Sequence, residues 1–279
     1  MNVTFNKIRM YMSAAVAAMI MSHGVLADGG TIQLQGQDTI KGQRMIEYLK
    51  ALLTAPTLVG FPNVPGIDNA TTAPNGLGFV SISGAERTGI GAGSKKLNGT
   101  IALGVGIGSA ETGVSVQPML TITSVENLAE SGHMGLKFSR RIHSGEKPIY
   151  LGIGFNRLGT WGEETGYPSD STHTVSFSGF SSFISDTKKY PLMWTLGYGS
   201  HVKELGTEKG FQAGIGMGIH KNTALGLSTN GDVLNAGLSI NLPDMDDVNL
   251  STGFSDILDN DDARSFYLAV SYNFQAFGG

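Results

Sequence analysis

Residues 211–219 read Phe-Gln-Ala-Gly-Ile-Gly-Met-Gly-Ile, and this stretch decides the fold. Apolar side chains occupy every second position, and glutamine or glycine fills the positions between them. Because successive side chains of a β-strand point to opposite faces, the stretch predicts a strand with one apolar face and one small or polar face. The same alternation recurs in residues 101–108, 151–155 and 266–274.

Windows of this kind predict about twelve strands along the chain. Most windows hold about 8–15 residues, whereas a soluble strand has about 5–6 and a tilted membrane strand about 9–11. With one exception, the hairpin at Asn230 and Gly231, long and short connections alternate between them, as they do in transmembrane barrels. We therefore expect an all-β fold, a closed antiparallel transmembrane β-barrel of about twelve strands with a short N-terminal helical segment. The windows are 76–83, 98–109, 111–125, 132–143, 148–158, 171–184, 189–203, 209–220, 223–230, 232–242, 247–256 and 264–275.

The N-terminus has the three parts of a secretory signal peptide. Lys7 and Arg9 precede an apolar run over residues 10–21, and Val25 and Ala27 stand at the −3 and −1 positions before Asp28. The run is shorter than the roughly 20 residues that a helix needs to cross a bilayer. We expect residues 1–27 to be a signal peptide; the alternative is an N-terminal amphipathic or buried helix.

Composition excludes several classes of function. The formal net charge of −4 removes the electrostatic reason to expect binding to nucleic acid. The absence of cysteine excludes disulfides, thiolate metal sites and cysteine nucleophiles. Glycine accounts for 40 of 279 residues and charged residues for only 15%, which is unusual for a cytosolic globular protein.

Residues 28–75 differ from the rest of the chain. Residues 38–55 place apolar side chains at helical spacing, and Pro56 suits the end of that helix. Four prolines follow between residues 55 and 75, which predicts an irregular connection. We expect residues 28–75 to be a plug inside the barrel or a periplasmic or disordered leader, and residues 76–279 to form the barrel.

The last predicted strand, Ser-Phe-Tyr-Leu-Ala-Val-Ser-Tyr-Asn-Phe at residues 265–274, resembles the closing strand of bacterial outer-membrane β-barrel proteins. That family ends in alternating apolar residues with a C-terminal aromatic residue, which the barrel assembly machinery reads. The resemblance implies that Tyr272 and Phe274 form this assembly signal. It also implies location in the bacterial outer membrane once the signal peptide has been removed.

The predicted strands have two different faces. The apolar face is expected to contact lipid, and an Arg at Val105 or Ile215 is expected to cost about 2–4 kcal/mol near the midplane. The other face is mostly Gly and Ser, a wall expected to leave volume for water or a plug, and Gly106→Ser is expected to be milder than the Arg changes. Aromatic residues near strand ends, Tyr267 and Tyr272 among them, suit an interfacial girdle. The expected membrane-facing residues are Ile101, Leu103, Val105, Ile107, Phe211, Ile215, Met217, Phe266, Leu268 and Val270.

Candidates for chemistry are few. His173, with Asp170 and Ser171, is the nearest approach to a catalytic group, although a solvated loop explains these residues better. Asp259, Asp261 and Asp262 lie in a run of acidic residues, but the run lacks the spacing and glycine of an EF-hand loop. No cofactor site is expected.

The function that these patterns favour is passive. We expect a porin-like channel or a structural surface protein whose partners are the lipid bilayer, the barrel assembly machinery and small solutes, with no nucleic acid. The alternatives are an exported soluble or surface-attached all-β binding protein and a barrel hydrolase. The sequence does not name a solute.

Overall fold

The computed structural model describes residues 68–87, 98–123, 130–144, 147–162, 176–185, 190–203, 208–220, 222–242, 245–258 and 264–278. The predicted signal peptide, residues 1–27, and the predicted helix over residues 38–55 lie outside these ranges. Among the residues that are described, no helix is long and apolar enough to cross a membrane.

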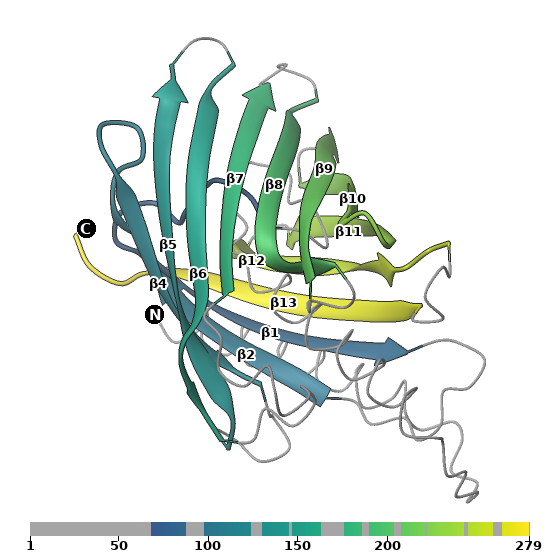
Figure 1. Ribbon diagram of the computed structural model, residues 1–279. Coiled ribbons are helices and arrows are strands. Elements are labelled where there is room, and N and C mark those ends of the chain that lie inside the picture. The colour runs from purple at the N-terminus through teal and green to yellow at the C-terminus, as the bar shows by residue number, and fades with distance from the viewer. Residues whose placement is uncertain are drawn as a thin grey trace, which may run out of the picture. The chain divides into compact units, whose positions relative to one another are not determined.

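The described chain forms one antiparallel sheet that closes on itself (Figure 1). β1 pairs with β2 on one side and with β13 on the other, and β2 pairs with β4. The strands are β1 (Leu77–Arg87), β2 (Asn98–Val105), β3 (Ile107–Gly108), β4 (Ser115–Ile122), β5 (Gly132–His143), β6 (Ile149–Trp161), β7 (Ser176–Ser185), β8 (Leu192–Lys203), β9 (Glu208–His220), β10 (Thr223–Thr229), β11 (Leu234–Leu242), β12 (Met245–Ser255) and β13 (Ser265–Gln275).

β2 and β3 are two parts of one strand, because both pair with β4 and only Gly106 separates them. At this break the backbone of Gly106 bonds to Gly76 and Leu77 instead of to β4. The barrel therefore has twelve strands, as the sequence predicted. A closed sheet has no free edge, so its strands satisfy one another's backbone groups.

The seam between the first and last strands is continuous. β1 and β13 pair in register from Leu77 opposite Gln275 to Arg87 opposite Ser265. β1 thus runs four residues beyond the predicted window, which ended at residue 83. Those four residues lack the alternation, and their pairing with β13 keeps them in the sheet.

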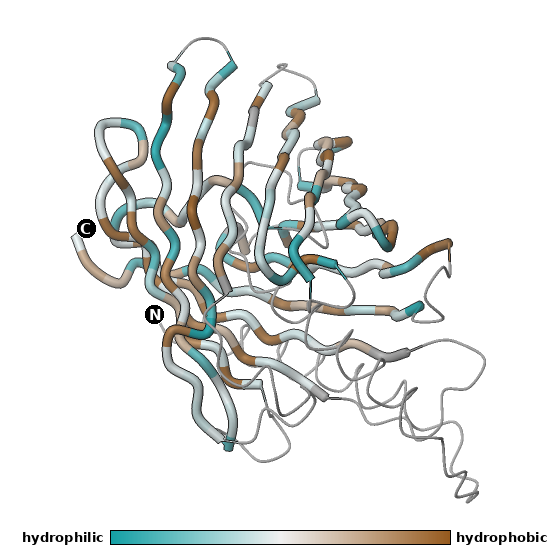
Figure 2. Tube along the Cα trace, viewed as in Figure 1, coloured by the Kyte–Doolittle hydropathy of each residue, from teal (hydrophilic) through white to brown (hydrophobic). Residues whose placement is uncertain are grey.

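Along each strand, apolar and polar or small residues alternate (Figure 2). In β5, for example, Met134 and Arg140 are exposed, whereas Lys137 and Ser139 are buried. The buried set faces the interior of the barrel. The twofold period of the sequence therefore sorts the side chains into an inner wall and an outer surface.

The glycines of the inner wall do not simply leave empty volume. A Cβ at Gly197 would lie 2.6 Å from the Phe180 ring on the neighbouring strand, and one at Gly104 would lie 2.5 Å from the Phe79 ring. Each ring belongs to the residue paired directly opposite its glycine. At these positions an aromatic ring lies over the glycine and occupies the space that a side chain would otherwise fill.

The side chain of Tyr267 on β13 also lies over a glycine inside the barrel. The prediction that Tyr267 belongs to an interfacial girdle is therefore wrong. Its side chain is fully buried, and its hydroxyl lies 2.5 Å from where a Cβ would stand on Gly253, its partner across the strand pair. The alternation of β13 puts Tyr267 on the same face as Ser271, whose hydroxyl donates to Ser81 of β1. Position near a strand end was a weaker guide than the face that the residue occupies.

Candidate functional site

The inner wall of the barrel is polar and the outer surface is apolar. Among the described residues, buried polar side chains outnumber buried hydrophobic ones, and large hydrophobic side chains are exposed along most strands. Phe211 and Leu196 are 74% and 65% exposed, whereas Gln117 and Lys137 are 0% and 1% exposed. A soluble domain has the opposite arrangement, because burial of apolar surface stabilises its fold.

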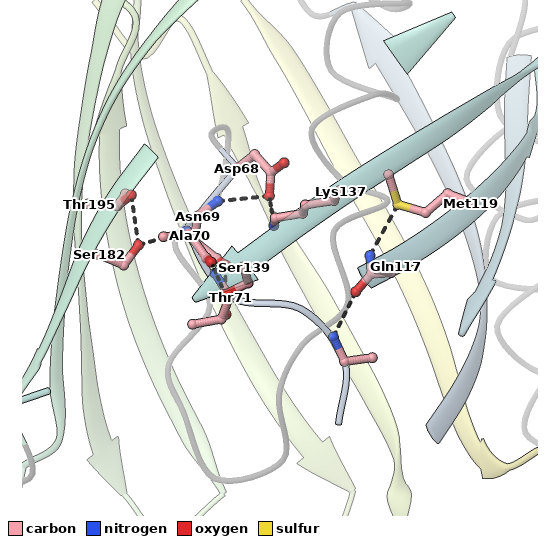
Figure 3. A network of polar contacts seen from close by, with 11 residues as sticks. Asp68, Asn69, Ala70, Thr71, Gln117, Met119, Lys137, Ser139, Ser182 and Thr195 are labelled. Atoms are coloured by element: carbon pink, nitrogen blue, oxygen red, sulfur yellow. Dashed lines mark hydrogen bonds and ion pairs between the residues drawn. The ribbon is translucent and has the colours of Figure 1, made fainter. Parts of the chain in front are cut away.

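A short segment that precedes β1 lies on the inner wall. We call residues 68–75 the strap. Asn69, Ala70 and Ala73 of the strap are buried, each with 5% exposure or less. Between residues 68 and 74 the strap has no ladder pairing with the sheet. Side chains of the wall therefore provide its contacts there (Figure 3).

One end of the strap makes an ion pair with β5. The Lys137 Nζ donates to Asp68 Oδ1 at 2.6 Å. The side chain of Lys137 is 1% exposed and that of Asp68 is 20% exposed. Lysine is almost never fully buried unless it is paired, so the Asp68 carboxylate is what makes Lys137 tolerable in the wall.

The middle of the strap is held by hydroxyl groups from two strands. The backbone N–H of Ala70 donates to Ser182 Oγ on β7 at 2.9 Å. The Ser182 hydroxyl in turn donates to Thr195 Oγ1 on β8 at 3.0 Å, and Ser139 Oγ on β5 donates to the Ala70 carbonyl at 2.6 Å. Both backbone polar groups of Ala70 are thus satisfied by the wall, as buried groups require.

The other end of the strap contacts β4. The backbone N–H of Ala73 donates to Gln117 Oε1 at 2.7 Å, and the Thr72 hydroxyl donates to Ser115 Oγ at 2.6 Å. Figure 3 shows Gln117 of β4, Lys137 and Ser139 of β5, and Ser182 of β7 reaching the strap. The strap consequently crosses the inner wall from β4 to β7.

The wall carries glycine where the strap approaches it most closely. A Cβ at Gly152 of β6 would stand 2.7 Å from Ala70 Cα, and one at Gly106 would collide with the carbonyl oxygens of Ala73 and Pro74. Gly106→Ser was expected to be milder than the Arg changes. The structure adds a steric cost to this substitution, because a Cβ at Gly106 meets backbone atoms of the strap, which cannot rotate away.

On the other side of the barrel, polar side chains of the wall bond to one another. Asn249 of β12 donates to Ser239 and to Asn241 of β11, at 2.9 and 2.8 Å. Asn235 of β11 accepts from the Ser255 hydroxyl at 2.6 Å. We call the set Ser228, Asn235, Ser239, Asn241, Asn249, Ser251 and Ser255 the amide ladder.

The expected membrane-facing residues all lie on the outer face of their strands. Leu103, Ile107, Phe211, Met217 and Phe266 are among the exposed large hydrophobics, and the others are half-buried between their neighbours. At the end of β13, the rings of Tyr272 and Phe274 stack with centroids 6.1 Å apart. Lipid contact at these residues and recognition of the two rings remain predictions.

The candidate residues for chemistry lie outside the described residues. This applies to Asp170, Ser171 and His173 and to the run that holds Asp259, Asp261 and Asp262. Within the described ranges, no group of three or more His, Cys, Asp or Glu side chains is placed to hold a metal ion.

Sequence reasoning offered a plug from residues 28–75 as one alternative, but it identified neither the strap nor its partners, although the sequence carried one signal. Lys137 occupies an inward position of β5, between Gly135 and Ser139. A cation buried on that face requires a partner inside the barrel. The composition of the strap, with small polar residues between prolines, indicated only an irregular connection.

Solved structures with a similar fold are outer-membrane proteins. A "KdgM porin in complex with disordered oligogalacturonate" is 11% identical, with a TM-score of 0.44 over 70% of this chain and 99% of that chain. The outer membrane protein Omp33 of Acinetobacter baumannii is 10% identical, with a TM-score of 0.43 over 72% of this chain and 98% of that chain.

The similarity also extends to an enzyme. Outer membrane phospholipase A from Escherichia coli is 11% identical, with a TM-score of 0.39 over 84% of this chain and 99% of that chain. No protein-family model matches the sequence, and no curated protein matches it. The function therefore has to be inferred from the features of this chain's own barrel.

Proposed function

We propose that the protein is an outer-membrane channel through which small solutes pass passively. The observation that carries this proposal is the inverted barrel, in which a closed sheet has a polar inner wall and an apolar outer surface. In a bilayer only helices and closed barrels satisfy all backbone groups. An exposed apolar surface of this extent suits hydrocarbon, because in water it would drive aggregation.

The chemistry of the inner wall suits polar solutes. Hydroxyl and amide groups dominate it, including Gln117, Gln212 and Asn273, and the cation Lys137 is paired with Asp68. Such groups exchange hydrogen bonds with water and with polar solutes, whereas apolar molecules gain nothing from them. We propose small polar solutes as the cargo.

The rest of the proposal concerns how the chain reaches the membrane. Residues 1–27 are a signal peptide, residues 28–75 a plug and residues 76–279 the barrel. The assembly machinery recognises Tyr272 and Phe274 on the closing strand. Contacts of residues 68–75 with the inner wall support the plug, and the stacked aromatic pair at the end of β13 supports the assembly signal.

The first experiment is fractionation combined with gel mobility. Expressing cells are separated into soluble and outer-membrane fractions, and the protein is run boiled and unboiled. We expect recovery in the outer membrane with a mobility shift on boiling, followed by stepwise conductance in planar bilayers. Soluble recovery without a shift contradicts the membrane barrel, and a shifted barrel without conductance contradicts the channel.

A further inference from the structure

We propose that the strap is a releasable gate, held in the lumen by the pair between Lys137 and Asp68. This inference rests on the proposed channel function and names the element that controls it. In the docked position the strap crosses the inner wall from β4 to β7, which reduces the cross-section that a solute can use. Release widens the path.

The way in which the strap is held allows release without damage to the barrel. Between Asp68 and Ala73 it has no ladder pairing, and its wall contacts come from side chains of β4, β5 and β7. All backbone pairing of those strands stays intact when these contacts break. The strap is therefore a separate unit from the sheet on which it lies.

The strap also has a hinge. Its contacts end at Asn75, whose backbone bridges Gly106, and Gly76 follows with φ of +78°. Positive φ is strained for other residues but free for glycine. Beyond the hinge, β1 is fixed to β13 by the full register of the seam. Movement of the strap is thus confined to the residues before Gly76.

The wall is shaped to receive the strap. Gly152 provides room for Ala70, and Gly106 provides room for Ala73 and Pro74. Lys137 has a second role, because it is the buried cation that the Asp68 carboxylate neutralises. Release of the strap therefore changes two properties of the lumen together: it opens space and it exposes one positive charge.

The chain offers a direct test, because it contains no cysteine. The hydroxyl oxygens of Thr72 and Ser115 lie 2.6 Å apart, so sulfur atoms at these positions can approach the bonding distance of about 2.05 Å. The double variant T72C/S115C places a disulfide between strap and β4. The single variants T72C and S115C are the controls.

Conductance of the double variant is measured in planar bilayers under oxidising conditions and after addition of dithiothreitol. We expect the reduced form to show openings of several-fold higher conductance with a shift toward anion selectivity, and we expect the oxidised form to lack these openings. The single variants should respond to neither treatment. Equal conductance in the oxidised and reduced forms, with the cross-link verified by mass spectrometry, overturns the gate.

A second measurement keeps the test independent of conductance. The rate at which a maleimide modifies T72C in the folded barrel reports release of the strap. G152A adds a Cβ 2.7 Å from Ala70 Cα. G154A, on the same face of the same strand, meets two side chains outside the strap, the Ser178 hydroxyl at 3.0 Å and the Phe180 ring at 3.9 Å. We expect labelling about tenfold faster with G152A, equivalent to about 1.4 kcal/mol weaker docking, and unchanged with G154A.

The two measurements separate the two ideas. If no form conducts although the barrel is folded, the channel proposal fails, and the labelling rates still decide whether the strap is released. If labelling is equally slow in the parent, G152A and G154A backgrounds, the strap is a fixed part of the wall and the gate is wrong.

Discussion

Polar side chains on the two sides of the inner wall obtain their hydrogen-bond partners in different ways. Along β10 to β12, the amide ladder satisfies its polar groups within the wall, as when Asn249 donates to Ser239 and Asn241. Along β4 to β7, Gln117, Ser139 and Lys137 instead bond to the strap. A polar lumen thus consists of one side that is complete by itself and one side that the strap completes.

This difference has an energetic meaning. A buried hydrogen-bonding group that loses its partner costs about 1–3 kcal/mol, and a charged group more. Undocking the strap removes partners from Gln117, Lys137 and Ser139 on the β4–β7 side. The bonds of Asn249 and the Ser255–Asn235 bond lie within the amide ladder and do not involve the strap. A substitution on the strap side can therefore undock the strap and change the space in the lumen. A substitution on the ladder side should change only the stability of the barrel.

The largest expected loss of stability comes from a charge on the outer surface of the barrel. It should not depend on whether the strand belongs to the strap side or to the ladder side of the inner wall. Ile215→Arg on β9 and Val105→Arg on β2 each place a charge on the outer surface, at an expected cost of about 2–4 kcal/mol near the bilayer midplane. Urea unfolding in lipid vesicles, followed by the fluorescence of the two tryptophans, measures the free energy of unfolding.

Phe211→Arg is the control, because Phe211 lies near the start of β9, at Glu208, where the cost should fall toward about 1 kcal/mol. Wild-type stability in both Ile215→Arg and Val105→Arg would show that these two residues do not face lipid. That result would contradict the membrane barrel.

The next largest expected effect, that of Asp68→Ala, should arise on the strap side alone. Asp68→Ala leaves Lys137 in the wall without its carboxylate, and removal of one partner of a buried ion pair costs about 3–5 kcal/mol. Because a fifth of the Asp68 side chain is exposed, we expect about 3 kcal/mol or less. The measurements are urea unfolding and maleimide labelling of T72C, which should become faster.

Replacement of both partners, Asp68→Ala with Lys137→Met, is the control for that variant. The double change removes the unpaired charge, so much of the stability should return while labelling stays fast. If the double variant is as unstable as the single one, the unpaired cation is not the cause.

Asn235→Ala tests the amide ladder. It removes the acceptor of the Ser255 hydroxyl and of the Asp256 N–H, and we expect a loss of about 2 kcal/mol in the free energy of unfolding. Labelling of T72C should not change, because Asn235 bonds to Ser228, Ser255 and Asp256, which lie outside the strap. Faster labelling would mean that the two sides are coupled and would break the comparison.

The smallest effect is expected for Ser182→Ala on the strap side. Its hydroxyl accepts from Ala70 and donates to Thr195, and a neutral hydrogen bond contributes about 0.5–1.5 kcal/mol. The loss should appear in the labelling rate of T72C and hardly in urea unfolding. The reverse result would assign Ser182 to the barrel and not to the docking of the strap.

The barrel was readable from sequence because its signal is periodic. Each strand repeats the alternation of large and small residues, so the strand count and the two faces follow from residues such as Phe211 and Gly216. The extension of β1 to Arg87 was not readable, because pairing with β13 alone maintains it. The close contacts of Gly106 and Gly152 with the strap could not be predicted either. In the sequence, a glycine that makes room for another segment cannot be distinguished from any other small residue of the inner face.

The strap could not be predicted from its own residues. Its partners are single side chains that lie 69 residues away in the case of Lys137 and 112 in the case of Ser182. No repeat marks such contacts. Only the inward position of Lys137 indicated that a carboxylate had to be inside the barrel.

The position of the strap just before β1 also sets an order of events during assembly. Docking of Asp68 on Lys137 closes a loop of 69 residues, whereas the bond between Ser81 and Ser271 at the seam spans 190. The entropic cost of closing a loop rises with the logarithm of the loop length. Closing the strap contact therefore costs about 1 kcal/mol less than closing the contact between Ser81 and Ser271 at the seam. We expect the strap to settle on a sheet that is still open, and the ring then to close around it.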